Sequence, residues 1–309
     1  MGIGDIHQVK ADTCGHIYYV DVGMYGVAEY SSVYIIDDDR PTVVETGLGT
    51  RTELILDALA ELGIDPADLE VIALTHVHLD HAGGVGALAE ACPNATVAVH
   101  ERGVPHLIDP TAIVAGTKEV VGEFWDYYTE PTPVPEDRLR ALRDGDVLDL
   151  GATELHVHHA PGHASHQVLY EVPAADAVFT ADAVGSYFPA LGGVKAVSSP
   201  PEFDLAQCLA DVDLVRSLDP STLLFSHFGS RPTGEILEEY DAVLRAWIAK
   251  IARQRQQLDD DRAVFERLLD ASVTPPNWPE DIVYGEFRTN FSGATMYLDQ
   301  YDNFPAILH

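Results

Sequence analysis

Short runs of β-branched and aromatic residues alternate with turn residues through much of the chain, which is typical of strands. Stretches with apolar residues at every third or fourth position separate some of these runs and predict helices. The strands expected from this pattern are 17–20, 32–36, 42–45, 71–74, 96–99, 147–150, 154–158, 167–172, 177–180 and 222–225. The expected helices are 51–62, 85–91, 114–128 and 205–218. Strands followed by helices, twice along the chain, predict an α/β (α+β) fold with two sheets packed face to face and helices outside.

The last quarter of the chain has a different pattern. Residues 233–270 are almost wholly helical in spacing, with an acidic break at 259–261, and a proline-containing, aromatic tail follows. We therefore expect a main domain at 1–230 and a helical C-terminal extension at 231–309 packed on it. Within the main domain, the less regular segment 105–135 is expected to form a cap-like insert. Its aromatic residues at 124–128 either cap a site or pack on the outer helices.

The charge balance excludes one class of function. Lys plus Arg is 18 and Asp plus Glu is 50, which gives a formal net charge of −32. A surface this negative repels phosphate backbones, so no nucleic-acid partner is expected. An Asp-rich, Lys-poor surface indicates a halophilic, archaeal-like protein of a cytosol kept at high salt; an acidic protein of an ordinary cytosol is the alternative.

The cysteines and the start of the chain point to the cytoplasm. Cys14, Cys92 and Cys208 are odd in number and far apart, so neither a disulfide framework nor a thiolate zinc site is expected. The sequence has no stretch of the length needed to span a membrane, and its first residues do not read as a signal peptide. We expect a cytoplasmic protein with no membrane partner.

A dense group of metal-ligand residues lies directly after the expected strand 71–74. His76, His78, Asp80 and His81 fall within six positions and precede a helix. Neutral imidazole and carboxylate are ligands that borderline divalent metals such as Zn²⁺ prefer. His76 and His78 are two apart on an extended segment and point the same way, whereas Asp80 and His81 follow after the chain turns. One segment can therefore supply ligands to two adjacent metals.

Three later residues stand at the ends of expected strands, where loops usually carry site residues. They are His163, Asp182 and His227. Each of them alone is more often a structural residue, but together with the first group they complete a ligand set.

In these motifs the chain resembles the metallo-β-lactamase superfamily, which has a four-layer αββα fold and the ordered pattern His-x-His-x-Asp-His, His, Asp, His. The resemblance implies that a first metal is bound by His76, His78 and His163, and a second by Asp80, His81 and His227, with Asp182 bridging both. It also implies two divalent transition-metal ions as cofactors, with Zn²⁺ expected and Fe or Mn as alternatives. Glu45 stands where the family usually has Asp, in a position that supports the ligands rather than binding metal.

Differences within the superfamily narrow the expected chemistry. Asp182 and His81 stand where one large class of true β-lactamases has Cys and Arg, so antibiotic hydrolysis is not expected. His78 replaces the Glu of the oxygen-reducing diiron relatives, and residues 82–86 lack the Gly-Leu-Pro-Gly element of the tRNA-processing nucleases. The chain is therefore most similar to the glyoxalase II and lactonase side of the family, which acts on small thioesters, esters or lactones.

The resemblance implies hydrolysis by a hydroxide that bridges the two metals and attacks the substrate carbonyl. Asp80 would ligate and also orient the nucleophile or accept its proton. Tyr187 would donate a hydrogen bond to the substrate, unless it is a core tyrosine. His166 would support a ligand or transfer protons, unless it is a polar residue at a strand edge.

Several alternatives remain open at this point. They are a phosphodiesterase or RNase Z-like nuclease, an iron-dependent sulfur dioxygenase, and an inactive metal-binding module. The expected partner is a small-molecule substrate. The sequence decides neither the substrate nor the physiological metal, and it leaves a homodimer open.

Overall fold

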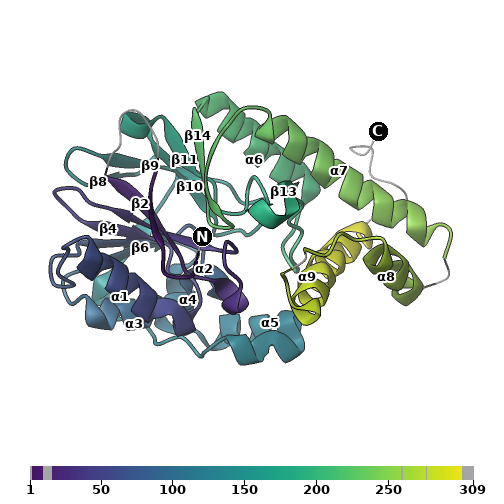
Figure 1. Cartoon of the computed structure of the whole chain (residues 1–309), viewed down its shortest axis with the longest axis horizontal. Coiled ribbons are helices and arrows are strands. Elements are labelled where there is room, and N and C mark those ends of the chain that lie inside the picture. Colours follow the sequence, from purple (N-terminus) through teal and green to yellow (C-terminus); the bar gives the residue numbers. More distant parts are fainter. Residues whose placement is uncertain (1, 10–15, 259, 276, 301–309) are drawn as a thin grey trace.

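The computed structural model describes residues 2–9, 16–258, 260–275 and 277–300. Two sheets lie face to face, and helices cover the outer face of each (Figure 1). The expected arrangement of two packed sheets with helices outside is confirmed. Cys14 and Asp259 lie outside the described residues, and Cys92 and Cys208 are buried free thiols.

The first sheet has the order β1-β2-β3-β4-β5-β6-β7 among the described residues. Neighbours from β1 to β4 are antiparallel, and those from β4 to β7 are parallel. Its strands are β1 Ile6–Gln8, β2 Ile17–Asp21, β3 Ser32–Ile36, β4 Thr42–Val44, β5 Val71–Ala73, β6 Thr96–His100 and β7 Leu139–Leu142. Because β4 and β5 are parallel, the residues that follow each of them emerge at the same edge.

The second sheet has the order β15-β14-β11-β10-β9-β8, and its strands are antiparallel except for the parallel pair β11 and β14. The strands are β8 Val147–Asp149, β9 Glu154–His159, β10 Val168–Val172, β11 Ala177–Phe179, β14 Thr222–Phe225 and β15 Gly229–Pro232. A small hairpin joins β12 Ser186–Phe188 to β13 Gly193–Lys195. The carboxyl ends of β11 and β14 also meet at one edge.

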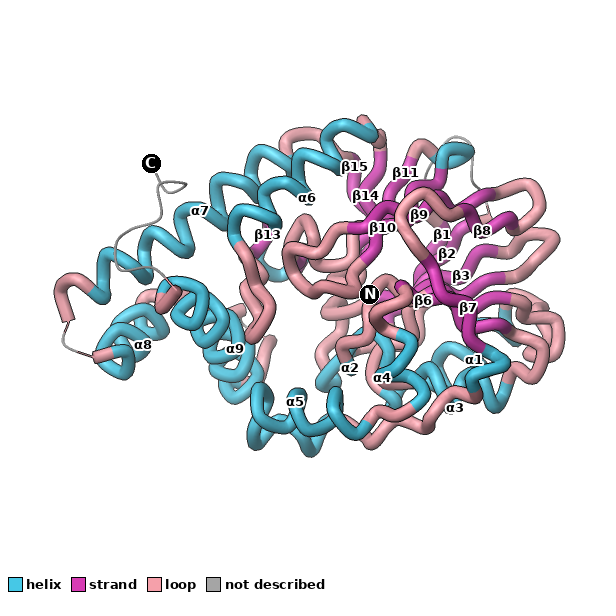
Figure 2. The backbone as a smooth tube through the Cα atoms, turned by 180° about the vertical axis from the view of Figure 1, so that it is seen from behind, coloured by secondary structure: helices cyan, strands magenta, loops and turns pink. Residues whose placement is uncertain are grey.

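The helices lie over the outer faces of the two sheets, and further helices lie beside the sheets (Figure 2). Their bounds are α1 Thr52–Glu61, α2 Leu79–Ala82, α3 Val85–Ala91, α4 Val104–Ile108, α5 Thr111–Val121, α6 Leu205–Leu218, α7 Ile236–Arg255, α8 Asp261–Asp270 and α9 Glu280–Leu298. No helix among the described residues is both long and apolar enough to cross a membrane.

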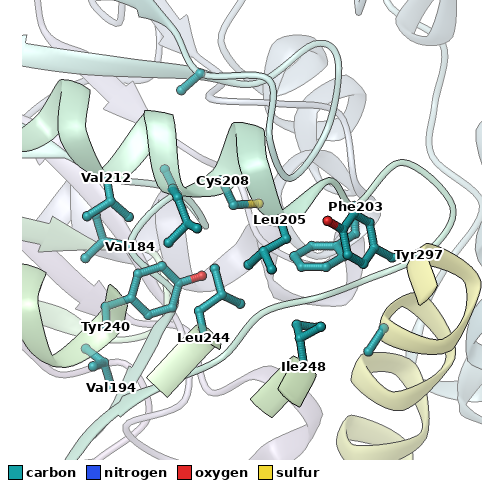
Figure 3. Packing of buried hydrophobic residues seen from close by; sticks show 14 of the residues in the cluster. Val184, Val194, Phe203, Leu205, Cys208, Val212, Tyr240, Leu244, Ile248 and Tyr297 are labelled. Carbon is teal, nitrogen blue, oxygen red and sulfur yellow. The ribbon is translucent and has the colours of Figure 1, made fainter. Parts of the chain in front are cut away.

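Separate apolar clusters fill the spaces between the layers. Between the sheets, Tyr34 and Val44 of the first sheet pack with Tyr170 and Phe179 of the second. A second cluster joins α1 and α3 to the first sheet. The third joins α6, α7 and α9 to the second sheet, and Figure 3 shows Tyr240 and the neighbouring residues pointing into it. Because burial of apolar surface is the main favourable term in folding, these clusters hold the sheet edges in place.

The expected and observed elements differ where local signals were weak. The helix expected at 114–128 is instead α5, followed by a 3-10 segment Gly122–Tyr127, because Gly122 adopts φ +58° and ends the α-helix. Helical structure in 233–270 is divided into α7 and α8, and the side chain of Asp260 caps α8 by accepting the N–H of Ala263. The aromatic tail contains the long helix α9, whose bounds the sequence did not indicate.

The C-terminal helices pack on the rest of the chain, with α9 in contact with α5 as well as α7 and α8. Phe124 lies against Gly285 of α9, where an added Cβ would stand 2.6 Å from its ring. The expected boundary at residue 230 falls inside β15, which is paired with β14. The last strand of the second sheet therefore extends beyond the expected boundary.

Candidate metal centre

Loops from both sheets bring the expected site residues together at one edge of the sandwich. The connections that carry them follow β4, β5, β11 and β14 or join β9 to β10. The side chains concerned are Glu45, His76, His78, Asp80, His81, His163, Asp182 and His227. Carboxyl ends of parallel strands meet at one edge, which explains why residues far apart in sequence converge here.

The first group of ligand atoms comes from His76, His78 and His163. Nδ1 of His78 lies 3.1 Å from Nε2 of His76 and 2.9 Å from Nε2 of His163. These three nitrogens lie close enough together to bind one metal ion. The extended backbone at His78, with ψ 144°, places its ring beside that of His76 before α2 begins.

The second group comes from Asp80, His81 and His227. Oδ2 of Asp80 lies 3.5 Å from Nε2 of His81 and 3.6 Å from Nε2 of His227. These atoms also form a grouping that could hold a metal. Asp80 and His81 are both on α2, the short helix that begins where the strand-like segment ends.

Asp182 lies between the two groups. Its Oδ2 is 3.2 Å from Nε2 of His163 and 3.5 Å from Nε2 of His81, and its Oδ1 is 3.7 Å from Nε2 of His227. Oδ1 is buried without a hydrogen-bond partner among the described residues, as is Nε2 of His81. Buried polar atoms left without partners cost free energy, so this donor set fits divalent cations.

Electrostatics at the site favour ionised carboxylates. Burial alone would raise the pKa of Asp182, but the imidazoles of His81 and His163 outweigh it and lower this pKa. Asp80 follows the same pattern, with its pKa lowered by His81 and His227 against the effect of burial. Burial instead lowers the pKa of His163 to about 4, so its ring is neutral at pH 7. Ionised carboxylate and neutral imidazole are the forms that bind metal.

Glu45 supports the centre from behind. Its Oε1 lies 3.3 Å from Nδ1 of His81 and accepts hydrogen bonds from the hydroxyls of Thr75 and Ser226. Thr75 in turn contacts Nδ1 of His76 at 3.0 Å. Glu45, His76 and His81 also have ligand atoms close enough together to hold a metal ion. This third group shares its histidines with the two groups described above. We interpret Glu45 as a supporting residue, because it faces the ring nitrogen of His81 that points away from Asp80 and Asp182.

A buried carboxylate on α6 holds the turn that carries His163. Oδ2 of Asp211 accepts the N–H of Gly162 at 2.7 Å. Gly162 approaches α6 so closely that an added Cβ would lie 2.4 Å from the backbone nitrogen of Cys208. Sequence reasoning missed Asp211 as well as Thr75 and Ser226. Thr75 and Ser226 each directly precede an expected ligand, His76 or His227, and that position could have pointed to them; Asp211 carried no such signal.

The two residues with expected auxiliary roles lie in different surroundings. His166 is buried beside His76 and His78, with its ring centroid 5.6 Å from that of His78. Burial lowers the pKa of His166 to about 2, so its ring is neutral at pH 7. Its expected role beside the ligands stays a prediction. Tyr187 packs against Phe225 and beneath the guanidinium of Arg231, and it is not among the described residues that line the cavity next to the centre.

That cavity has a volume of about 480 Å³ and opens onto His78, Asp80, His163, Asp182 and His227. Its walls come from the N-terminal region, from the insert helix α5 and from α9. Among the wall residues are Tyr25, Tyr30, Ile113, Gly116, Tyr128, Phe188, Glu286 and Arg288. A largely apolar cavity with a few polar groups is typical of a small-molecule site.

The aromatic segment at 124–128 contributes both to the cavity and to the packing of the outer helices. Tyr128 lines the cavity, and its hydroxyl lies 2.8 Å from that of Tyr25. Phe124 packs on α9 instead. The cavity therefore depends on α9, whose residues Glu286 and Arg288 were not expected near the site.

Comparison with known proteins decides the family. The model of the metallo-beta-lactamase superfamily matches residues 26–227, which is well over half of the chain. The chain belongs to the metallo-beta-lactamase superfamily. The matched range ends at His227 and includes all the expected metal ligands, whereas α7, α8 and α9 lie beyond it.

Relatives within the superfamily include several named hydrolases. A metallo-beta-lactamase fold-containing protein of Sulfurisphaera tokodaii is 24% identical over 74% of this chain and 83% of its own length. A hydroxyacylglutathione hydrolase of Jannaschia sp. is 34% identical over 54% of this chain, and the human acyl-coenzyme A thioesterase MBLAC2 is 27% identical over 54%. The matches span only 51% and 63% of those two proteins. Together with the family, these relatives support a hydrolase whose substrate is unassigned.

Solved structures agree on the fold. A superfamily protein from Sulfolobus tokodaii superposes with a TM-score of 0.69 at 20% identity, covering 91% of this chain and 99% of that one. A B3 metallo-beta-lactamase with an active-site glutamic acid gives a TM-score of 0.58 at 23% identity, over 81% and 91% of the two chains. The prediction of the αββα metallo-beta-lactamase fold is confirmed.

Proposed function

We propose that this chain is a dinuclear metal-dependent hydrolase of a small carbonyl substrate, with a thioester as the expected class and esters and lactones as alternatives. The position of Asp182 carries the proposal. Its two carboxylate oxygens face imidazoles of both ligand groups, at 3.2 Å from His163 and 3.7 Å from His227. A carboxylate between two sets of ligands is suited to bridge two cations.

Besides the bridging carboxylate, the proposed ligands form two groups of three, one for each metal ion. His76, His78 and His163 would hold one ion, and Asp80, His81 and His227 the other. Nitrogen and carboxylate ligands favour Zn²⁺, and Fe or Mn also fit such a set. When bound, a pair of divalent ions makes hydroxide available near neutral pH and polarises a carbonyl group.

The protein's own groups would position the reactants. Asp80 lines the cavity, and its side chain is 25% exposed, so its carboxylate can orient the attacking water and accept a proton from it. Tyr30, Tyr128 and Phe188 line the same cavity and exclude water around the substrate. Glu45 keeps His81 in one orientation during turnover.

The thioester assignment is supported by two relatives. One is named an acyl-coenzyme A thioesterase and the other a hydroxyacylglutathione hydrolase. The net charge of −32 argues against nucleic-acid substrates and supports a cytosol of high salt as the compartment. A small-molecule substrate also suits a cavity of about 480 Å³.

The test combines metal analysis with a substrate panel. Protein purified without chelator in molar KCl is analysed for bound metal and assayed with matched thioesters, esters, lactones and a phosphodiester. We expect two ions per chain and preferential turnover of a carbonyl substrate, lost on chelation and restored by metal. Turnover of the phosphodiester alone would favour a nuclease-like enzyme instead. Oxygen-dependent oxidation of a persulfide would favour the dioxygenase, and full metal loading without any turnover would favour an inactive module.

A further inference from the structure

A second cavity lies next to the active-site cavity, on the side of the C-terminal helices. It has a volume of about 370 Å³, is open to solvent on one side, and is lined by α7, α9, the hairpin strand β13 and residues that precede α9. The two cavities share Phe188, Glu286 and Asn290 as lining residues. The second cavity contains none of the proposed metal ligands, so it is a separate site.

Apolar side chains make up most of this second cavity. Val243, Trp247 and Phe287 are on the long helices, and Trp278 comes from the segment before α9. Trp278 packs edge-on against Phe188, with ring centroids 4.9 Å apart, and so forms part of the wall toward the active site. A lining of this type and size is what sites for apolar small molecules require.

The charges at this cavity are unusual for this chain. The sequence has four lysines, Lys10, Lys118, Lys195 and Lys250, and two of them, Lys195 and Lys250, line the second cavity. Lys118 pairs with Glu130 at 2.8 Å, but in the described part of the chain neither Lys195 nor Lys250 forms an ion pair. Unpaired cations are unexpected beside 50 acidic side chains.

The described lining contains one acidic group beside the two lysines. Glu286 is the carboxyl group in the shared wall, and burial raises its pKa. With two ammonium groups and one carboxyl group, the charge of the lining is net positive, although the molecule as a whole is strongly negative. An anion repelled by most of the surface would meet favourable charge at this place.

We propose that the second cavity binds an amphiphilic carboxylate, with its alkyl chain against Trp247 and Phe287 and its carboxylate beside Lys195 and Lys250. The apolar lining provides the burial that an alkyl chain needs, and the two ammonium groups provide the charge that its head group needs. Binding of this ligand does not require the proposed hydrolase activity, so the two proposals can fail independently.

Equilibrium dialysis of the intact protein with radiolabelled dodecanoate tests the site. We expect saturable binding of one equivalent. Dodecanol and dodecyltrimethylammonium, which have the same chain length, should compete at least about tenfold less well, since they lack the negative charge. The double variant Lys195→Gln/Lys250→Gln should bind dodecanoate about tenfold more weakly. Ala246→Phe, at an exposed lining position, should also weaken binding by partly filling the cavity.

Two control variants distinguish binding in this cavity from binding elsewhere on the protein. Lys118→Gln removes a lysine that does not line the cavity, and Gly116→Leu adds a side chain to the active-site cavity, where an added Cβ meets nothing within 4 Å. Both should bind dodecanoate as the wild type does, with unchanged melting temperatures for all variants. Loss of binding in Gly116→Leu, wild-type binding in the double lysine variant, or equal competition by the cationic amphiphile would each overturn the proposal.

Discussion

Oε1 of Glu45 lies 3.3 Å from Nδ1 of His81, on the opposite side of the ring from the nitrogen that faces Asp80 and Asp182. The same oxygen accepts the hydroxyl hydrogen bonds of Thr75 and Ser226. One buried carboxylate therefore connects the segments that follow three strands, β4, β5 and β14. Contacts of this type fix the orientation and the tautomer of a ligating histidine.

Replacing Glu45 by Gln should weaken metal binding without unfolding the protein. The amide keeps the shape but loses the charge, so the Nδ1–H of His81 and the hydroxyl of Thr75 lose their common charged acceptor. Supporting residues of this type typically contribute about 10–100-fold in metal affinity or activity. Competition titration with a metal-binding dye measures the affinity. Glu61→Gln, at an exposed position of α1, serves as the charge-matched control. Equal metal affinity in Glu45→Gln and wild type would contradict the supporting role.

Asp182→Asn tests the bridging position. The variant keeps the volume of the side chain but removes the negative charge between the two ligand groups, so two neighbouring cations would repel each other more strongly. We expect the metal content to fall from two ions per chain toward one, and turnover to fall by at least about 100-fold. Inductively coupled plasma mass spectrometry of the purified variant gives the stoichiometry. Two retained ions together with wild-type turnover would show that Asp182 does not bridge.

Local sequence patterns predicted the strands of both sheets that lie next to the site, because these strands are continuous apolar runs. They also predicted His76, His78, Asp80 and His81 as a group, because the four residues are adjacent in sequence. The same patterns missed β1, β7 and β15, which are short or lie at sheet edges and have weak hydrophobic signals.

Some site residues that are distant in sequence from the histidine motif could not be predicted. Glu286 and Arg288 reach the active-site cavity only because α9 packs on α5, and no local pattern records that contact. Asp211 acts through a backbone hydrogen bond to Gly162, 49 positions earlier, and so resembles any other helix residue in the sequence. Tyr187 was expected near the substrate because it follows Asp182 by five residues, but its ring packs beneath the guanidinium of Arg231.

The buried carboxyl group of Asp21 predicts a definite pH dependence of stability. Burial raises the pKa of Asp21 to about 6, even though its oxygens accept the N–H groups of Gly23 and Glu29. Its ordinary value near 4 applies to the unfolded chain. Between these two values the folded state binds more protons than the unfolded state. This group therefore makes the protein less stable as pH rises from about 4 to about 6.

Asp21→Asn removes this titration. The quantity to compare is the free energy of unfolding of the variant minus that of wild type. This difference should increase by up to about 3 kcal/mol from pH 4 to pH 7, because only the wild type loses stability over this range through Asp21. The absolute stability of the variant can be lower, because an amide presents only one acceptor to two N–H groups, but the slope with pH does not depend on that loss. Urea unfolding at both pH values, in constant KCl and with metal saturating, measures the difference. A difference that is independent of pH would contradict the raised pKa.

The last prediction concerns the acidic surface as a whole. With 50 acidic side chains and 18 basic ones, most carboxylates have no cationic partner. At 0.01 M salt the screening length is about 30 Å, comparable to the size of the domain, so repulsion adds up over the whole molecule. Near 1 M it falls to about 3 Å, and only adjacent charges still interact. The folded state, which holds these charges closer together than the unfolded chain does, should gain stability as KCl rises.

Thermal melts from millimolar to molar KCl measure this gain. We expect the melting temperature to rise by at least about 5 °C, which corresponds to roughly 3 kcal/mol for a chain of this size. Metal must be saturating and chelator absent, because loss of metal would also lower the melting temperature. A parallel series in sucrose controls for stabilisation by general exclusion from the protein surface. If the melting temperature stays flat or falls with KCl, the acidic surface is no adaptation to salt. The metal centre would be unaffected by that result, because it depends on buried residues whose contacts bulk salt screens far less.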